Sequence, residues 1–367
     1  MAKRQAEQDS LFMARALYLA KKGSYTTKPN PRVGCVIVKD SEIIAEGWHV
    51  RAGQGHAEVE ALKNIQDAQG ATAYVTLEPC SHYGRTPPCA EALMKAGVAR
   101  VVIAMQDPNP LVAGKGVALL EQAGINVDCG VLESEAQALN RGFVTRMITA
   151  KPYVISKMAM SLDGRTAMAS GESKWITESQ ARHDVQKLRA ASCCVLTGVG
   201  TVLADDPSMN VRLEGVEVEQ PLRVILDSQL RTPTSAKLLA LAGRTLILTC
   251  SDEQGKVEAL TQAGAEVYKI ARNDQGRVDL NAVLLFLAKQ QVNEVLVEAG
   301  SVLNGALMEQ NLIDECIVYM APSILGSSGR GLCDMPHITR MAEKKNLTLL
   351  DVRKVGVDLR LQYKVQK

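Results

Sequence analysis

The feature that most constrains this chain is a short set of potential metal ligands, His56, Cys80 and Cys89, accompanied by Glu58. One imidazole and two thiols fill three positions of a tetrahedral zinc site and leave the fourth for water, an arrangement typical of catalytic sites. Glu58 is not needed as a ligand, so its carboxylate is free to move protons. Together these residues predict a zinc-dependent hydrolase that removes an amino group from a nucleobase.

The spacing of these residues supports the same interpretation. His56 and Glu58 are two residues apart at the expected start of a helix, so one can face the metal while the other reaches the substrate. Cys80 follows the apolar run 73–77, at the end of an expected strand. Taken singly, the cysteines can be small buried residues and His56 an ordinary surface group. The set in this order favours a metal site.

Length and charge bound the class of protein. A chain of 367 residues is long enough for two domains, each with its own core. The 42 basic and 40 acidic residues give a net charge of +2, which does not indicate a nucleic-acid-binding surface. The N-terminus lacks the apolar core of a signal peptide, and no apolar run approaches the roughly 18 residues of a membrane span. Nine scattered cysteines fit reduced thiols better than disulfides, so we expect a cytoplasmic protein without a membrane partner.

Strands alternate with helices in the first part of the chain. We expect a helix over 11–22 capped by Ser10, strands over 33–38, 43–48, 73–77, 100–105 and 125–127, and helices after His56, over 89–97, 116–123 and 133–147. This alternation predicts a layered α/β domain whose sheet is partly parallel. Lys151-Pro152 then breaks the pattern. We therefore predict two domains, 1–148 and 149–367.

Two segments identify a family. Nucleobase deaminases generally end their metal motif in Pro-Cys-x-x-Cys, but here eight residues separate Cys80 from Cys89. This longer insert, together with Pro-Asn-Pro-Arg-Val-Gly at 29–34, resembles the deaminase half of the bifunctional riboflavin-biosynthesis deaminase–reductase family. The resemblance implies a cytidine-deaminase-like three-layer domain.

In this resemblance Asn30 and His49 bind the substrate, although an Asn between two prolines is by itself typical of a turn. His82 and Arg85 are candidates for binding the ribose phosphate, or they belong to a solvated loop.

The second half of the chain carries landmarks of the same family. They are Tyr-Val-Ile-Ser-Lys-Met-Ala-Met-Ser-Leu-Asp-Gly-Arg at 153–165, Gly-Glu-Ser-Lys-Trp-Ile-Thr at 171–177, Gly-Val-Gly-Thr-Val-Leu-Ala-Asp-Asp-Pro at 198–207 and Val-Glu-Ala-Gly-Ser-Val-Leu-Asn-Gly at 297–305. They resemble the reductase half, which has a dihydrofolate-reductase-like fold. Nearly the whole chain is covered, apart from the extreme N-terminus and much of 213–290.

The resemblance implies roles for individual positions in the second domain. The residues expected to line an NADPH cofactor are Ala159, Trp175, Thr201, Asp205, Ser228, Gly300, Ser301, Val302, Leu303, Asn304, Gly305 and Ala306. Those expected to bind the ribose-phosphate substrate are Ser173, Arg189, Arg212 and Glu298. Lys157 and Asp205 are candidates for a direct part in the reduction. Arginines can bind a phosphate bidentately, but Arg189 and Arg212 can also be read as ordinary surface residues, and Trp175 as a core residue.

One of these segments has a physical argument of its own. The apolar strand 294–297 delivers Gly300 to the start of a helix, whose free amides and positive dipole end favour a phosphate. The Rossmann pattern Gly-x-Gly-x-x-Gly is absent from the sequence, so a plain strand-to-helix turn is also compatible. The prediction of NADPH therefore depends mainly on the resemblance.

The expected function is a pair of consecutive reactions in riboflavin biosynthesis. They are the zinc-dependent deamination of 2,5-diamino-6-ribosylamino-4(3H)-pyrimidinone 5′-phosphate, and the NADPH-dependent reduction of the ribose of 5-amino-6-(5-phosphoribosylamino)uracil to a ribityl chain. A deaminase acting on a base in tRNA would share the zinc motif but would leave the second domain unexplained. A structural zinc module joined to a nucleotide sensor would need a fourth protein ligand, such as His82 or another cysteine.

We also expect a homodimer, because Leu359, Leu361, Tyr363 and Val365 alternate as in an edge strand that could pair across a two-fold axis; the same strand could equally be internal.

Overall fold

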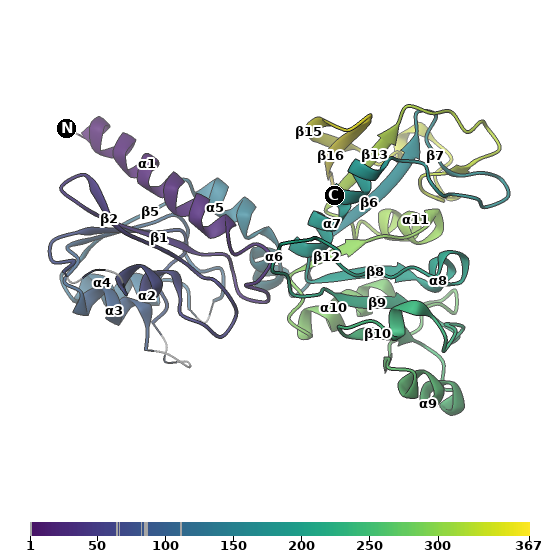
Figure 1. Ribbon diagram of the computed structural model, residues 1–367, viewed down its shortest axis with the longest axis horizontal. Coiled ribbons are helices and arrows are strands. Elements are labelled where there is room, and N and C mark those ends of the chain that lie inside the picture. The colour runs from purple at the N-terminus through teal and green to yellow at the C-terminus, as the bar shows by residue number, and fades with distance from the viewer. Residues whose placement is uncertain (1, 64, 66, 82, 84–86, 111) are drawn as a thin grey trace. The chain divides into compact units, whose positions relative to one another are not determined.

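The computed structural model describes residues 2–63, 65, 67–81, 83, 87–110 and 112–367, which form two compact units, Met1–Ala150 and Lys151–Lys367 (Figure 1). Each unit has its own sheet and its own core. Among the described residues, no helix is both long and apolar enough to cross a lipid bilayer.

The first unit is a five-stranded sheet between two layers of helices. Its elements are α1 (Ala2–Lys21), β1 (Gly34–Lys39), β2 (Glu42–Trp48), α2 (Ala57–Leu62), β3 (Thr72–Val75), α3 (Cys89–Lys95), β4 (Arg100–Ile103), α4 (Lys115–Gln122), β5 (Asn126–Cys129), α5 (Glu133–Leu139) and α6 (Arg141–Thr149). The strand order is β2-β1-β3-β4-β5, with β1 antiparallel to both neighbours and β3, β4 and β5 parallel. The expected partly parallel sheet is thus present.

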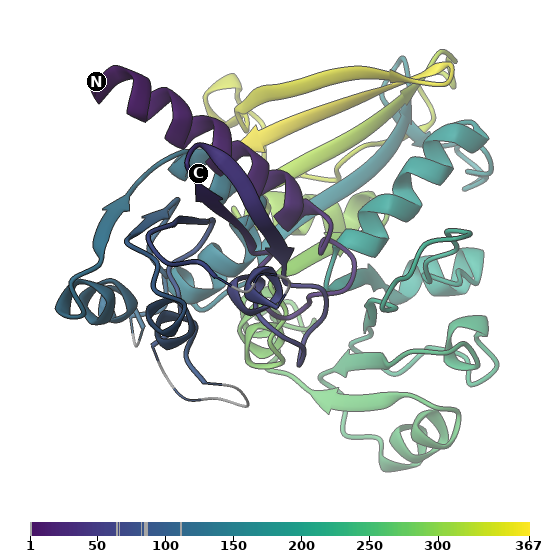
Figure 2. The same cartoon turned by 60° about the vertical axis from the view of Figure 1, so that its left-hand side comes forward.

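Strand alternation explains the three layers. Cys35 and Ile37 of β1 face a core shared with α2, α3 and α4, whereas Val36 and Val38 face a core shared with α1 and α5. Figure 2 shows the long helix α1 and the strands of this unit from a second side. Helices on both faces bury both sides of the sheet.

Two sequence predictions about this unit are wrong. Ser10 does not cap a helix: α1 begins at Ala2, because the polar residues before Ser10 are good helix formers, and the Ser10 hydroxyl donates to Ala6 O (2.9 Å). The helix expected over 133–147 is divided into α5 and α6 at Asn140. The buried Asn140 amide accepts from Arg32 N (2.8 Å) and donates to Arg32 O (2.9 Å), so it is fixed to another part of the chain.

The second unit is built on a nine-stranded sheet. Its elements are β6 (Tyr153–Ser161), β7 (Arg165–Ala167), α7 (Ser179–Ala191), β8 (Cys194–Gly198), α8 (Val199–Asp205), β9 (Leu222–Leu226), η1 (Lys237–Leu239), β10 (Thr245–Thr249), α9 (Gln254–Gln262), β11 (Glu266–Lys269), α10 (Leu280–Lys289), β12 (Glu294–Val297), α11 (Ser301–Glu309), β13 (Glu315–Ala321), β14 (Arg330–Gly331), η2 (Met341–Glu343), β15 (Leu347–Val355) and β16 (Asp358–Val365). The order is β11-β10-β9-β8-β12-β6-β13-β16-β15, and a separate two-stranded sheet joins β7 to β14.

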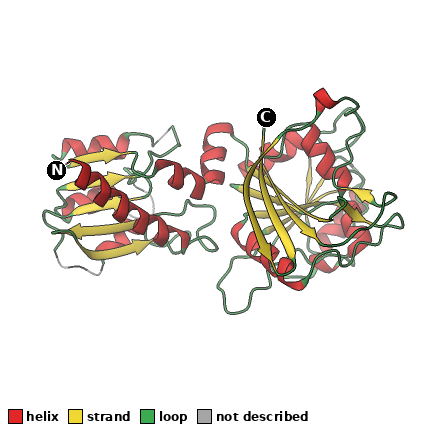
Figure 3. Cartoon of the chain, turned by 90° about the horizontal axis from the view of Figure 1, so that it is seen from above, coloured by secondary structure: helices red, strands yellow, loops and turns green. Residues whose placement is uncertain are grey.

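Seven neighbouring strands of this sheet, from β11 to β13, are parallel, and β16 and β15 add an antiparallel edge. Figure 3 shows the strands of the chain in yellow and the helices that accompany them in red. One face packs against α10 and α11, and the other against α7, α8 and α9. The strand that contains Leu359 and Tyr363 is therefore internal, paired to β13 and β15, so the expectation that it lies at the edge is wrong and β15 takes that place.

Candidate active sites

The three predicted zinc ligands converge in the first unit. His56 is the N-cap residue of α2, Cys80 follows β3, and Cys89 is the first residue of α3. His56 Nδ1 lies 3.2 Å from Cys89 Sγ and 3.6 Å from Cys80 Sγ, and all three ligand atoms lie within 4.8 Å of one another. Within the described part of the chain, no other group of His, Cys, Asp or Glu side chains gathers closely enough to hold a metal.

The helix that carries His56 is seated by a close backbone approach. A Cβ atom on Gly47 of β2 would lie 2.3 Å from Ala61 N, so only glycine allows α2 to pack this near to the sheet. Ala57, Glu58 and Ala61 form the buried side of α2. The helix is therefore fixed against the sheet with the half-buried His56 at its start.

The pKa values of the two thiols indicate whether this site suits a cation. Hydrogen bonds from the Cys89 thiol and from His56 outweigh burial and lower the pKa of Cys80 to about 4, and Cys89 N also donates to Cys80 Sγ (3.3 Å). The thiolate of Cys80, together with burial, raises the pKa of Cys89. Without a cation the second thiol therefore resists ionisation, whereas a divalent ion stabilises both thiolates. The donor set fits zinc.

Glu58 lies in the same buried pocket, only 3% exposed. Burial raises the pKa of its carboxyl group to about 7, partly opposed by a backbone hydrogen bond and by the positive charge of His56. A bound cation would lower this pKa again. The position suits a group that accepts and returns protons near a metal.

Asn30 and His49 form a hydrogen-bonded pair beside the ligands. Asn30 Nδ2 donates to His49 Nε2 (3.1 Å), so the imidazole carries its proton on Nδ1 and donates it to Gly55 O (3.0 Å). Burial lowers the pKa of His49, in keeping with this neutral form. Its ring stands edge-on to that of His56, with centroids 5.6 Å apart. His82 and Arg85, the candidates for the phosphate, lie outside the described residues.

In the second unit the predicted cofactor residues gather at the carboxyl ends of the parallel strands. Thr201 and Asp205 belong to α8 after β8, Ser228 follows β9, and Gly300 follows β12; Ala159 lies near the carboxyl end of β6. Because these strands are parallel, their carboxyl ends share an edge, where open α/β sheets bind ligands.

The turn at 300–306 divides into an open and a packed part. A Cβ atom on Gly300 would meet no atom within 4 Å, and Val302 is half exposed. Asn304 instead is buried, accepting from Ser156 Oγ (2.8 Å) and donating to Ala299 O (2.9 Å), and Gly305 packs against the backbone of Asp334. Gly300 and the first residues of α11 thus offer free amides, while Asn304 and Gly305 hold the turn in place.

Four predicted residues form an ionic cluster on the α7 face of the same unit. Arg189 binds Glu298 bidentately (2.5 and 2.9 Å). Burial opposes ionisation of Glu298, but Arg189, Lys157 and Arg212 outweigh it and keep the pKa of that carboxyl below its usual value. Burial also lowers the pKa of Lys157, whose Nζ lies 5.9 Å from the Tyr319 ring centroid.

Sequence reasoning missed a residue that joins the two arginines. Asn210 O accepts from Arg189 Nη1 (3.0 Å), and Asn210 Oδ1 accepts from Arg212 Nη1 (2.7 Å). Arg189 is largely buried and its guanidinium binds both oxygens of Glu298, whereas Arg212 is exposed. Arg212 therefore has more donors available to a ligand.

The segment with Ser173 and Trp175 forms an arm between β7 and α7. Trp175 is 70% exposed, so the alternative that it belongs to the core is wrong; the Arg182 guanidinium lies 4.5 Å from its ring centroid. Lys174 pairs with Asp205 (3.2 Å), which ties the arm to α8. Ser173 and Trp175 are thereby held near the predicted cofactor edge.

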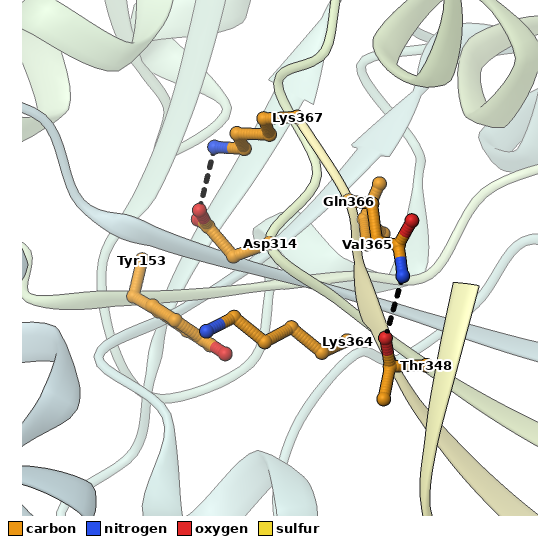
Figure 4. Close-up of a pocket in the computed structure, with 7 residues that line it drawn as sticks. All are labelled: Tyr153, Asp314, Thr348, Lys364, Val365, Gln366 and Lys367. Atoms are coloured by element: carbon orange, nitrogen blue, oxygen red, sulfur yellow. Dashed lines mark hydrogen bonds and ion pairs between the residues drawn. The ribbon is translucent and has the colours of Figure 1, made fainter. Parts of the chain in front are cut away.

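A cavity of about 350 Å³ lies at the other end of the parallel strands, where β6 and β13 begin (Figure 4). It is lined by Tyr153 at the amino end of β6, by Asp314 before β13, and by residues of β15, β16 and the C-terminus. Lys367 pairs with Asp314 across it (2.6 Å). This cavity is not where the predicted reductase residues gather.

Comparison with known families matches both units. Residues 6–105 match the cytidine and deoxycytidylate deaminase zinc-binding region, and residues 152–361 match the RibD C-terminal domain. These matches confirm the predicted fold class, a cytidine-deaminase-like unit followed by a reductase unit of mixed α/β structure.

Individual relatives match over nearly the full length. The chain is 49% identical to riboflavin biosynthesis protein RibD of Escherichia coli K12, covering 96% of this chain and 98% of that protein, and 48% identical to that of Haemophilus influenzae, covering 98% of each. The structure of Acinetobacter baumannii RibD superposes with a TM-score of 0.92 at 50% identity, covering 99% of this chain and 100% of that one. A Thermotoga maritima structure, described as a diaminohydroxyphosphoribosylaminopyrimidine deaminase/5-amino-6-(5-phosphoribosylamino)uracil reductase, matches with a TM-score of 0.87 at 33% identity and the same coverage.

Proposed function

The chain belongs to the RibD family of bifunctional riboflavin-biosynthesis enzymes, and from this premise we propose how its residues divide two reactions between two domains. Residues 1–148 form the diaminohydroxyphosphoribosylaminopyrimidine deaminase, and residues 149–367 form the 5-amino-6-(5-phosphoribosylamino)uracil reductase. The substrates are small pyrimidine ribotides. The first domain makes the uracil ribotide that the second domain consumes.

In the deaminase, His56, Cys80 and Cys89 would hold zinc, which when bound would make water a better nucleophile by lowering its pKa toward ~7. Glu58 would take one proton from the attacking water and give it to the ring nitrogen. Glu58 would then take the proton of the new hydroxyl group on the ring carbon and pass it to the departing amine, so that ammonia leaves and a carbonyl remains. The support for this role is the burial of Glu58 beside the three ligands.

Asn30 and His49 orient the pyrimidine. Their mutual hydrogen bond fixes the direction of the Asn30 amide, and the contact between the His49 and His56 rings sets the pair against the ligands. A fixed amide can pair with one edge of the ring and present the amino-bearing carbon to the attacking water.

In the reductase, NADPH supplies the hydride that reduces C1′ of the opened ribose. Ala159, Trp175, Thr201, Asp205, Ser228 and the turn 300–306 line the cofactor. Ser173, Arg189, Arg212 and Glu298 bind the substrate, with Arg212 toward the phosphate and Arg189 orienting Glu298. Lys157 faces Glu298 within the same cluster, which supports a direct part for it in the reduction.

The protein forms a homodimer through β15. This edge strand exposes Leu347, Leu349, Leu350 and Val352, each between 42 and 53% exposed. Exposed apolar edge strands are prone to pair with a second copy. Light scattering should show a dimer that Leu350→Asp disrupts, with Leu285→Asp on α10 as the matched surface control.

The observation that carries the proposal is the convergence of one imidazole, two thiols and a buried free carboxylate in a unit joined to a reductase unit. The test supplies the diaminopyrimidine ribotide with and without NADPH and follows ammonia release and cofactor absorbance separately. We expect ammonia without NADPH, and cofactor oxidation only after deamination. Cofactor oxidation with no ammonia release would contradict the assignment.

A further inference from the structure

Glu78 is a buried carboxylate that neither proposed reaction uses. It lies two residues before Cys80 and is 4% exposed. Its oxygens accept from four backbone amides: Oε1 from Gly116 N (2.8 Å) and Val117 N (3.3 Å), and Oε2 from Gly114 N (3.0 Å) and Asp107 N (3.1 Å). A buried acidic group with this many donors is held in one orientation.

These amides belong to the loop before α4 and to its first turn. The N-cap residue of α4 is Gly114, which has no side chain to accept from the free amides of the helix. Glu78 takes over that function from a distant part of the chain, and its negative charge also suits the positive end of the helix.

The same segment is fixed through its backbone. Glu78 N donates to Met105 O (3.0 Å). A Cβ atom on Gly116 would lie 2.0 Å from Pro79 O, so the start of α4 packs directly on the residue before Cys80. The segment before Cys80 is therefore held through the side chain of Glu78, which binds Asp107, Gly114 and the start of α4, and through its backbone, which contacts Met105 and Gly116.

We propose that Glu78 is a positioning residue of the zinc site, which fixes the Pro79–Cys80 turn against the start of α4 and so sets the place of the Cys80 sulfur. This inference rests on the proposed function of His56, Cys80 and Cys89 as zinc ligands. Glu78 touches neither metal nor substrate. It acts because a shift of the backbone that carries Cys80 would break these hydrogen bonds to the Glu78 carboxylate.

Glu78→Gln is the informative change because it preserves shape but turns one acceptor oxygen into an NH2 group that faces amide donors. Loss of groups that orient metal ligands typically weakens metal binding by about 10–100-fold, and we expect a loss of that size here. Glu78→Asp, which retains the charge on a shorter side chain, should fall between Glu78→Gln and the wild type.

The matched control is Asp9→Asn. Asp9 is another buried carboxylate of the same unit, 5% exposed, bound to Arg100 (2.8 Å) and Tyr74 (2.8 Å) away from the ligands. This variant should lower the melting temperature but leave zinc affinity at the wild-type value. Cys89→Ser serves as the reference for loss of a ligand.

The experiment uses the full-length chain and measures zinc affinity by competition with a chromogenic chelator, together with the absorption spectrum of the cobalt-substituted protein. The circular dichroism spectrum of each preparation reports that the chain is folded, and cofactor oxidation by the reductase reports that the second unit is intact. The expected result is weaker zinc binding and an altered cobalt–thiolate spectrum in Glu78→Gln, and neither in Asp9→Asn. If Glu78→Gln does not fold, Glu78→Asp decides by the same two measurements.

Wild-type affinity and spectrum in the Glu78 variant would overturn the inference, as would an equal loss of affinity in Asp9→Asn, which would make the effect one of general stability. Other results would contradict the assignment of His56, Cys80 and Cys89 as zinc ligands. They are a wild-type protein that binds no zinc, or a Cys89→Ser variant that binds zinc as tightly as the wild type.

Discussion

The two sites of this chain solve opposite electrostatic problems. In the first unit two thiols share a pocket in which, without a metal, only one of them ionises easily. A positive ion is needed to stabilise the second thiolate. In the second unit three cationic side chains surround the single carboxylate Glu298, so the protein part of the site has cationic groups in excess. The first arrangement fits a bound metal, and the second fits an anionic substrate.

This difference indicates that the two activities depend on separate groups of residues. The residues proposed for the deaminase all lie before 150 and those proposed for the reductase after 151, within units that have their own cores. A change in one site should therefore leave the other activity intact, and the unchanged activity shows that the effect of a variant is confined to its own unit.

The largest effect is expected for Glu58→Ala. Removing a general acid and base typically costs about 10²–10⁴-fold in rate, and we expect ammonia release to fall by this amount. Bound zinc and cofactor oxidation on the uracil ribotide should stay at wild-type values, because Glu58 is neither a ligand nor part of the second unit. Ammonia release near the wild-type rate would remove Glu58 from the mechanism.

A smaller effect is expected for Arg189→Ala, confined to the reductase. Hydrogen bonds to charged groups contribute about 1.5–3 kcal/mol, which corresponds to roughly 10–100-fold in the KM for the uracil ribotide. Breaking the buried pair also leaves Glu298 uncompensated, at about 3–5 kcal/mol of unfolding free energy. Steady-state kinetics and denaturant unfolding measure the two parts.

Arg189→Lys and Arg212→Ala are the matched controls for this change. Lysine cannot reproduce the bidentate contact with Glu298, so Arg189→Lys should recover only part of the loss. Arg212 is exposed, so Arg212→Ala should raise the KM without lowering stability. A greater loss of stability in Arg212→Ala than in Arg189→Ala would reverse our assignment of the two arginines.

The smallest effect concerns Asp163, at the turn before the arm that carries Ser173. Hydrogen bonds from Ser161 Oγ, Leu325 N and Gly326 N lower the pKa of Asp163 from 3.8 to about 2. Because the folded-state pKa is depressed, the carboxylate stabilises the fold above about pH 3.8, and this contribution is lost as the pH falls toward 2.

The variant Asp163→Asn should therefore unfold at lower urea concentration than the wild type at neutral pH, and the difference should shrink between pH 3.8 and about 2. Trp175 fluorescence in a Trp48→Phe background reports on this unit. A difference that is constant over this pH range would show that the Asp163 carboxylate does not stabilise the turn.

The two sites also differ in how much of each could be predicted from the sequence. His56 and Cys89 are 33 residues apart and belong to residue types with a specific metal chemistry, so their order alone predicts a site. Arg189 and Glu298 are 109 residues apart and belong to types that occur on every surface, so only the family resemblance singled them out. Their pairing depends on how the last turn of α7 packs against the residue that follows β12, which periodicity does not reveal.

Glu78 and Asn210 escaped sequence reasoning for a related reason. The partners of Glu78 are backbone amides 29 to 39 residues later in the chain, and backbone amides have no signature in a sequence. Asn210 joins Arg189 through its carbonyl oxygen, which every residue has. The break at Asn140 was missed likewise, because its amide binds the backbone of Arg32, 108 residues away.

A zinc ion with three protein ligands and one open position is the central feature of the proposed deaminase site. X-ray absorption at the zinc edge of the full-length protein measures this directly, since zinc–sulfur distances of about 2.3 Å separate from zinc–nitrogen or zinc–oxygen distances of about 2.0–2.2 Å. We predict two sulfurs, one imidazole nitrogen and one oxygen from solvent, with the sulfur count reduced in Cys89→Ser. A third sulfur or a second imidazole in the wild type would make the site closed and structural, and would contradict the account.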